Sequence, residues 1–182
     1  TAEALIMQYE FKADLANYLA TRPGARIRGL ADLIRFNQAH ADQELPYFGQ
    51  ERLVQSEARG PLTDGLYLRA LDHTTTFGRS FARLFDEQNF AALVAPTNAP
   101  AWAIDLLNGD HVLGGSAKAA AVCGFPLITV PAGFVADLLP IGLTFMGPAM
   151  TEPTLVKLAY AFEQAQPVRR APAYAATTLG FP

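Results

Sequence analysis

"GGSAKAAAVCGFPLITVPAG", residues 114–133, contains the change from helix to strand that decides the class of fold. Ser116 precedes a run of small helix-forming residues, and serine is favoured at a helix N-cap because its hydroxyl can accept a hydrogen bond from a free backbone amide. Gly124 follows the run, at the position where glycine commonly ends a helix. The apolar residues after Pro126 then predict a short strand bounded by proline and glycine.

Two more runs of this kind lie on either side of the stretch. Residues 90–97, "FAALVAPT", and residues 140–147, "PIGLTFMG", are short, β-prone and bounded by proline or glycine. After the last of them, Thr151 and Pro153 begin "TEPTLVKLAYAFEQA", whose apolar residues recur on one helical face. The second half of the chain therefore predicts three strands with helices between them.

The first half predicts helices only. Apolar residues recur at helical intervals in residues 1–22, 30–37 and 50–58, and each segment is followed by a turn or by proline and glycine. Thr63 or Asp64 could cap a longer helix that runs to about Gln88. Helices and strands together indicate an α/β fold, and no repeat or linker divides the chain.

Composition excludes several classes of protein. The chain has 182 residues, of which 51% are apolar and 17% are charged, as in one globular domain. Its formal charge of -3 is spread along the chain, so we expect no nucleic-acid partner. The longest apolar run, residues 119–139, is too interrupted by proline and glycine for a membrane helix. With a single cysteine and no leader, the expected location is the cytoplasm.

Ser116 is the first candidate for chemistry, with Lys118 as its base. A serine and a lysine in such a pair must lie within hydrogen-bond reach, but residues two apart at a helix start point to different sides. The N-cap role of Ser116 is therefore favoured over a nucleophilic one.

The other reactive residue types form no clear constellation. The three histidines lie far apart at positions 40, 73 and 111, without metal-ligand spacing, and Cys123 sits in an apolar helix as a small buried residue. In the long segment 98–116, Asp105, Asn108, Asp110 and His111 could form a polar cluster, or the Asn-Gly-Asp stretch simply makes turns. Trp102 either packs or lines a pocket.

The residues themselves resemble the C-terminal portion of the amidase signature family, especially its peptide-amidase-like bacterial members. The resemblance extends from about Glu3 to Pro172. It is carried by Gly-Phe-Pro-x-x-x-Val-Pro-Ala-Gly at 124–133, by the Pro-x-Gly-Leu strand that begins at Pro140, and by the helix with Glu-Pro-Thr-Leu. It implies helices around part of a mixed β-sheet, with residues 1–182 forming the C-terminal portion of an amidase signature domain.

The family hydrolyses carboxamides to carboxylate and ammonia through a serine acyl-enzyme, without a cofactor. Its nucleophilic serine, its second serine and its lysine lie in an N-terminal portion that includes a Gly-Gly-Ser-Ser-Gly-Gly type of stretch. This chain has no such stretch, and "GGSA" at 114–117 is only a partial likeness. The resemblance therefore carries over no catalytic residue, and we expect the chain to be an inactive piece of a longer enzyme.

The resemblance also suggests where substrate binds. Loops 96–102 and 113–116 would line the acyl side of the pocket, and the candidate residues are Thr97, Asn98, Trp102, Gly114 and Ser116. The expected partners are an amide substrate, the N-terminal part of the same protein, and a second copy of the chain. Two alternatives remain: a non-catalytic amidase-like subunit or interaction module, and the glutamine-hydrolysing subunit of a tRNA-dependent amidotransferase.

Overall fold

The computed structural model describes residues 1–172 and 174. These residues form two compact units, one of Thr1–Thr76 and one that begins at Phe77. Helix α5 (Gly65–Gln88) runs through the division between them. The division therefore falls inside a regular helix, where no linker composition can mark it. Helices together with a small antiparallel sheet confirm the predicted α/β class.

The first unit consists of helices at the predicted places. They are α1 (Ala2–Ala20), α2 (Leu30–Ala39), α3 (Ala41–Glu44), α4 (Glu51–Glu57) and the first part of α5. The single-turn helix α3 is an addition to the prediction, since four residues are too few to show a periodic apolar pattern. Tyr9 of α1 and Leu30 of α2 are the most deeply buried apolar residues of this unit.

Hydrogen bonds join α1 to the segment before α5. The hydroxyl of Tyr9 donates to Asp64 Oδ2 at 2.7 Å, and the backbone N–H of Leu66 donates to Asp64 Oδ1 at 2.9 Å. These two bonds, the one from Tyr9 above all, hold the pKa of Asp64 below its ordinary value. Of the two predicted caps of α5, Asp64 is therefore the one whose side chain binds a free amide of the first turn.

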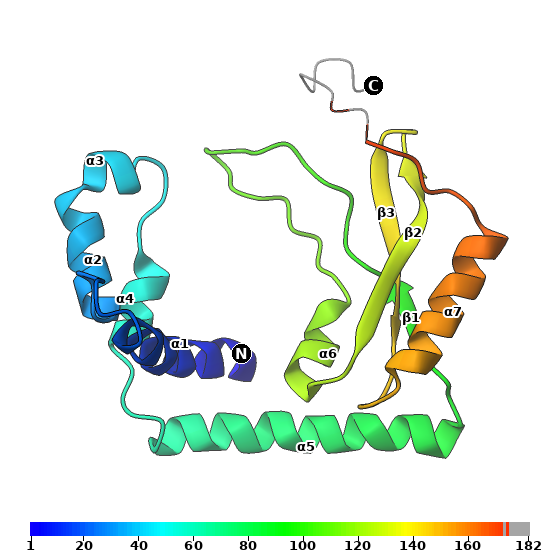
Figure 1. Cartoon of the computed structure of the whole chain (residues 1–182), viewed down its shortest axis with the longest axis horizontal. Coiled ribbons are helices and arrows are strands. Elements are labelled where there is room, and N and C mark those ends of the chain that lie inside the picture. The colour runs from blue at the N-terminus through cyan, green and yellow to red at the C-terminus, as the bar shows by residue number, and fades with distance from the viewer. Residues whose placement is uncertain (173, 175–182) are drawn as a thin grey trace. The chain divides into compact units, whose positions relative to one another are not determined.

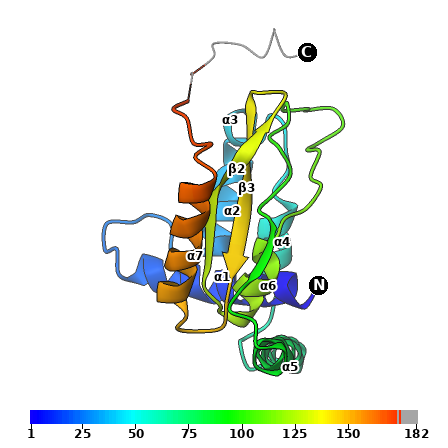
Figure 2. The ribbon, with the colours of Figure 1, turned by 90° about the vertical axis from the view of Figure 1, so that its right-hand side faces the viewer.

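The second unit is built on three strands, β1 (Leu93–Pro96), β2 (Leu127–Val135) and β3 (Leu139–Met146), at the predicted positions. Their order is β1-β3-β2 and both pairs are antiparallel. Figures 1 and 2 show α7 (Glu152–Ala165) on one face of this sheet and α6 (Ala117–Cys123) on the other. The sheet is thus the middle layer of the unit.

The face of the sheet under α7 carries the apolar core. Val130 of β2 and Phe145 of β3 pack with Leu155 and Ala159 of α7, and Phe145 and Phe162 meet edge to face. On the opposite face lie the alternate residues of the strands, among them Thr129 and Thr144, which are register partners. The face under α7 is therefore apolar, whereas the opposite face carries Thr129 and Thr144 beside apolar residues such as Leu127 and Met146.

The three predicted cap residues lie where expected, but two of them act differently. Gly124 ends α6 in the left-handed conformation, with φ of 68°, as predicted. Ser116 and Thr151 precede α6 and α7, yet neither side chain accepts a cap hydrogen bond. Both residues are already close to helical conformation rather than extended, so their hydroxyls instead donate to nearby carbonyls.

Candidate functional site

The segments on either side of the long loop meet at the end of β1. The backbone N–H of Ser116 donates to the carbonyl of Thr97 at 3.0 Å, and the Ser116 hydroxyl donates to the same oxygen at 3.3 Å. Asn98 and Gly115 form an isolated antiparallel bridge beside them. The structure thus brings together loops 96–102 and 113–116, which the resemblance predicts to line one pocket.

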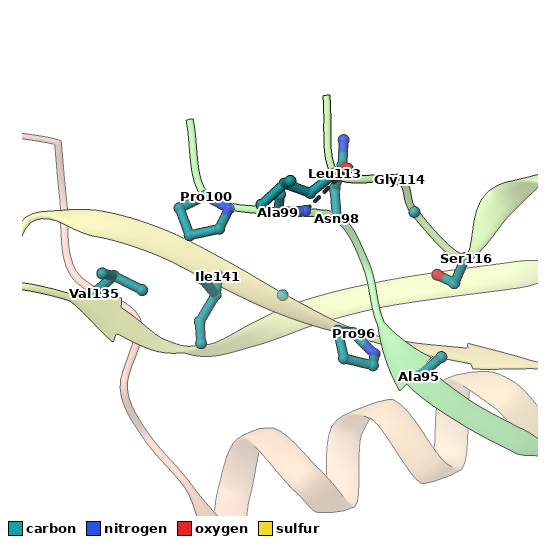
Figure 3. A pocket seen from close by; sticks show the side chains of 12 residues that line it. Ala95, Pro96, Asn98, Ala99, Pro100, Leu113, Gly114, Ser116, Val135 and Ile141 are labelled. Atoms are coloured by element: carbon teal, nitrogen blue, oxygen red, sulfur yellow. Dashed lines mark hydrogen bonds between the residues drawn. The ribbon is translucent and has the colours of Figure 1, made fainter. Parts of the chain in front are cut away.

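An open depression of about 630 Å³ lies where these loops meet the sheet (Figure 3). Loop residues form one side of it in Figure 3, and strand residues such as Pro96 and Ile141 form the other. Its lining is mostly apolar with few polar side chains, which is the usual character of a small-molecule pocket. The lining residues are Ala95, Pro96, Asn98, Ala99, Pro100, Leu113, Gly114, Gly115, Ser116, Val135, Ile141 and Gly142.

The polar groups of this wall are held by local bonds. Asn98 Oδ1 accepts from the backbone N–H of Ala99 at 2.9 Å, which fixes the direction of its side chain. A Cβ at Gly115 would lie 2.8 Å from the Thr97 carbonyl oxygen, so glycine is required for the two backbones to approach this closely. Asn98, Gly114 and Ser116 therefore line one wall built largely from backbone.

Three threonine hydroxyls lie beneath this wall on the face of the sheet opposite α7. Thr144 Oγ1 donates to Thr97 Oγ1 at 2.8 Å, Thr97 Oγ1 donates to Thr129 Oγ1 at 3.3 Å, and Thr129 and Thr144 are joined at 3.0 Å. We call Thr97, Thr129 and Thr144 the threonine ring. A second hollow of about 410 Å³, lined in part by Thr97 and Thr129, lies next to it. Of these three residues, only Thr97 was predicted from the sequence.

The long loop contains its own polar contacts. Asp105 accepts hydrogen bonds at 2.9 Å from the backbone N–H groups of Leu107 and Asn108 and from the Asn108 side chain, and these bonds lower the pKa of Asp105. The indole N–H of Trp102 donates to Asp110 at 3.2 Å. Trp102 is not among the described residues that line the depression. These contacts favour turn formation over a reactive cluster at Asp105 and Asn108.

Neither Ser116 nor Cys123 is placed to act as a nucleophile. Ser116 directs its proton to a carbonyl, which cannot serve as a base, and burial raises the pKa of the Cys123 thiol. Among the residues whose placement is described, no group of three or more His, Cys, Asp or Glu could bind a metal ion. No helix in that part of the chain is long and apolar enough to cross a membrane.

Comparisons with known proteins show clear relatives, although no family model matches the chain. A probable amidase of Arabidopsis thaliana is 31% identical over 97% of the chain. A glutamyl-tRNA(Gln) amidotransferase subunit of Desulforamulus reducens is 31% identical over 88% of the chain. A solved peptide amidase, in complex with the competitive inhibitor chymostatin, is 46% identical over 95% of the chain, with a TM-score of 0.90.

The match covers only part of each relative. The chain spans 31% of the plant protein, 35% of the peptide amidase and 34% of the amidotransferase subunit. It therefore corresponds to about a third of the length of these proteins, and the rest of each relative has no counterpart in the 182 residues.

Proposed function

The chain belongs to the amidase signature family, and we propose that residues 1–182 are the C-terminal portion of an enzyme that hydrolyses carboxamides. The proposal rests on the likeness to a solved peptide amidase along 95% of the chain. Peptide amides are therefore the first class of substrate to test. The products would be a carboxylate and ammonia.

The bond-breaking groups would come from outside this chain. A serine oxygen attacks the amide carbon, the C–N bond breaks, and the nitrogen leaves as ammonia after taking a proton; water then releases the carboxylate from the serine ester. The family's serine pair and lysine have no counterpart in this sequence. The chain alone should therefore release no ammonia, and the rest of the protein would be its obligatory partner.

This chain would supply the acyl side of the substrate pocket. The depression beside β1 has a mostly apolar lining with Asn98 and Ser116 as polar groups, and it lies against the loops that the resemblance assigns to substrate binding. Thr97 would support this wall, Gly114 would form part of it, and Trp102 would line it when substrate is bound. Replacing Trp102 by alanine in the full-length enzyme should change substrate preference more than folding.

Two further features of the proposal concern the protein's surroundings. A second copy of the chain is proposed as an additional partner, because a three-stranded sheet has two edge strands that another chain can cover. The cytoplasm is proposed as the compartment, because the only cysteine is a free thiol.

The second candidate function is glutamine hydrolysis for a tRNA-dependent amidotransferase. It is supported by several glutamyl-tRNA(Gln) amidotransferase subunits that are 30–31% identical to the chain. The higher identity to the peptide amidase, 46%, favours hydrolysis of peptide amides. A non-catalytic amidase-like module would bind amides without releasing ammonia.

Ammonia release separates these functions. The full-length protein should release ammonia from C-terminally amidated peptides faster than from glutamine, whereas residues 1–182 alone should release none. Ser116→Ala in the full-length protein should leave acyl-enzyme formation detectable, because Ser116 is not the nucleophile. Absence of ammonia from all amides with the full-length protein would refute the proposal, as would activity of residues 1–182 that Ser116→Ala abolishes.

A further inference from the structure

The threonine ring joins three strand segments that are distant in the sequence. Thr144 lies in β3 and Thr129 in β2, while Thr97 directly follows β1. Each threonine hydroxyl carries one hydrogen, and Thr144 donates its hydrogen to Thr97 at 2.8 Å. The Thr129–Thr144 contact must then have Thr129 as donor, and Thr97 donates to Thr129. Every hydroxyl of the ring therefore donates once and accepts once.

Thr97 is the member of the ring that is hydrogen-bonded to a lining residue of the candidate pocket, Ser116. Its backbone N–H donates to the Gly142 carbonyl at 2.8 Å, and its own carbonyl accepts both hydrogen bonds from Ser116. Its side chain is held by the other two hydroxyls of the ring. The position of the wall formed by Asn98, Gly114 and Ser116 therefore depends on where Thr97 is held relative to β3.

The two partners of Thr97 in the ring are not equivalent. Thr144 is only 2% exposed, so no water can replace its hydroxyl without opening the sheet. Thr129 is exposed, and its contact with Thr97 is longer, at 3.3 Å, so water can take its place. Removing the Thr144 hydroxyl therefore leaves Thr97 Oγ1 without its donor. Removing the Thr129 hydroxyl leaves Thr97 Oγ1 free to donate to water instead.

We propose that Thr144 is a positioning residue: by donating to Thr97 from within the sheet, it sets the wall of Asn98 and Ser116 and thereby the acyl groups that the pocket accepts. Thr144 does not line the depression. The part of this inference that concerns acyl groups rests on the proposed function. The part that concerns the position of the wall rests only on the hydrogen bonds from Thr144 to Thr97 and from Ser116 to Thr97, and on the burial of Thr144.

The test compares three variants of the full-length protein: Thr144→Val, Thr144→Ser and Thr129→Val. Valine keeps the shape of threonine and removes the hydroxyl, whereas serine keeps the hydroxyl. The first readout is hydrogen exchange of the Ser116 amide, which is bonded to the Thr97 carbonyl. The second is the ratio of kcat/KM for carboxamides with bulky and small acyl groups. This ratio does not change when only the folded fraction of enzyme falls.

Thr144→Val should accelerate exchange of the Ser116 amide by about 5-fold or more, and shift the substrate ratio by about 3-fold or more. Thr144→Ser should restore both values, and Thr129→Val should change each by less than Thr144→Val does. Unchanged exchange at Ser116 in Thr144→Val would overturn the proposal. So would equal effects of the two valine variants, or an unchanged substrate ratio in an active enzyme.

The proposed function can fail separately. If the wild-type full-length protein hydrolyses no amide, that function is refuted while the exchange readout still decides whether Thr144 holds the wall. If the enzyme is active and Ser116 exchange is insensitive to Thr144→Val, the positioning role alone is wrong.

Discussion

Replacing Gly142 by alanine tests whether the packing around the threonine ring is as tight as the structure shows. Gly142 is paired with Pro131 across β2 and β3, and its carbonyl accepts from the Thr97 N–H at 2.8 Å. A Cβ at this position would lie 2.7 Å from Thr97 Oγ1 and 2.7 Å from Thr129 Cγ2. The added methyl group would therefore meet two of the three ring members at once.

The cost follows from these two distances. Non-bonded carbon atoms in proteins are usually about 3.5–4.0 Å apart, so the contact with Thr129 Cγ2 is short by close to 1 Å. The contact with Thr97 Oγ1 is also closer than a real Cβ atom allows. Threonine has no flexible end that could swing away, and moving either residue breaks a bond of the ring. Overpacking of this kind costs about 1–3 kcal/mol, which corresponds to roughly a 5- to 150-fold shift in an opening equilibrium.

Hydrogen exchange of the Thr97 amide measures this opening directly, because that amide is bonded to the Gly142 carbonyl. In Gly142→Ala the amide should exchange faster by the factor given above. Adding Thr129→Ser removes Cγ2 but keeps the hydroxyl, so the double variant should recover part of the protection. Gly24→Ala is the control, since nothing lies within 4 Å of the added Cβ. Exchange within two-fold of wild type, or strict additivity of the two substitutions, would refute the reasoning.

Three further predictions concern the apolar core at Leu155, the carboxylate of Asp64 and the thiol of Cys123. Leu155→Ala should lower the free energy of unfolding, measured by chemical denaturation, by about 2–5 kcal/mol, because Leu155 is 2% exposed. Val156→Ala is the control: this side chain is 55% exposed, and its loss should change the free energy of unfolding by less than about 0.5 kcal/mol. Tyr9→Phe should raise the pKa of Asp64, as measured by NMR titration, because the hydrogen bond from Tyr9 lowers this pKa in the folded state. The ionised Asp64 therefore stabilises the fold above the carboxyl pKa of the unfolded chain, and this stability is lost as pH falls through the lower pKa of the folded state. The variant should lose less stability in acid than the wild type. Cys123 should react with an alkylating reagent more slowly than free cysteine at mildly alkaline pH, because burial raises its thiol pKa, and an equal rate would contradict this.

The elements that local sequence determines were predictable. Gly124 at the end of α6 and the proline- and glycine-bounded strands β1, β2 and β3 were found from residues next to one another in the chain. The hydrogen bonds that the Ser116 and Thr151 hydroxyls make in place of cap bonds were not predicted. Ser116 donates to the carbonyl of Thr97, which is distant in the sequence, and Thr151 donates to the carbonyl of Pro148 in the turn before α7. Residue preference identified the position but not the bonding partner.

The candidate site was predictable only where the resemblance pointed to it. Thr97, Asn98, Gly114 and Ser116 were named in advance, and the structure places them together at the end of β1. Thr144 and Thr129 were missed, because their role depends on β3 lying between β1 and β2, and Thr144 is 47 residues from Thr97. A polar residue at an alternating position in each of two apolar strands was the available signal.

In the site as proposed, this chain would bind the acyl part of the substrate, and groups outside it would break the bond. The wall of Asn98, Gly114 and Ser116 is hydrogen-bonded through Ser116 to Thr97, whose side chain accepts from the buried Thr144 hydroxyl. The Ser116 hydroxyl donates to a carbonyl, which cannot act as its base. Such a wall can discriminate between acyl groups by shape, since a small change in position alters contacts with substrate without touching the reacting atoms. Within this family, substitutions in this portion of the chain should therefore change which amide is hydrolysed more than the rate at which a well-fitting amide is cleaved.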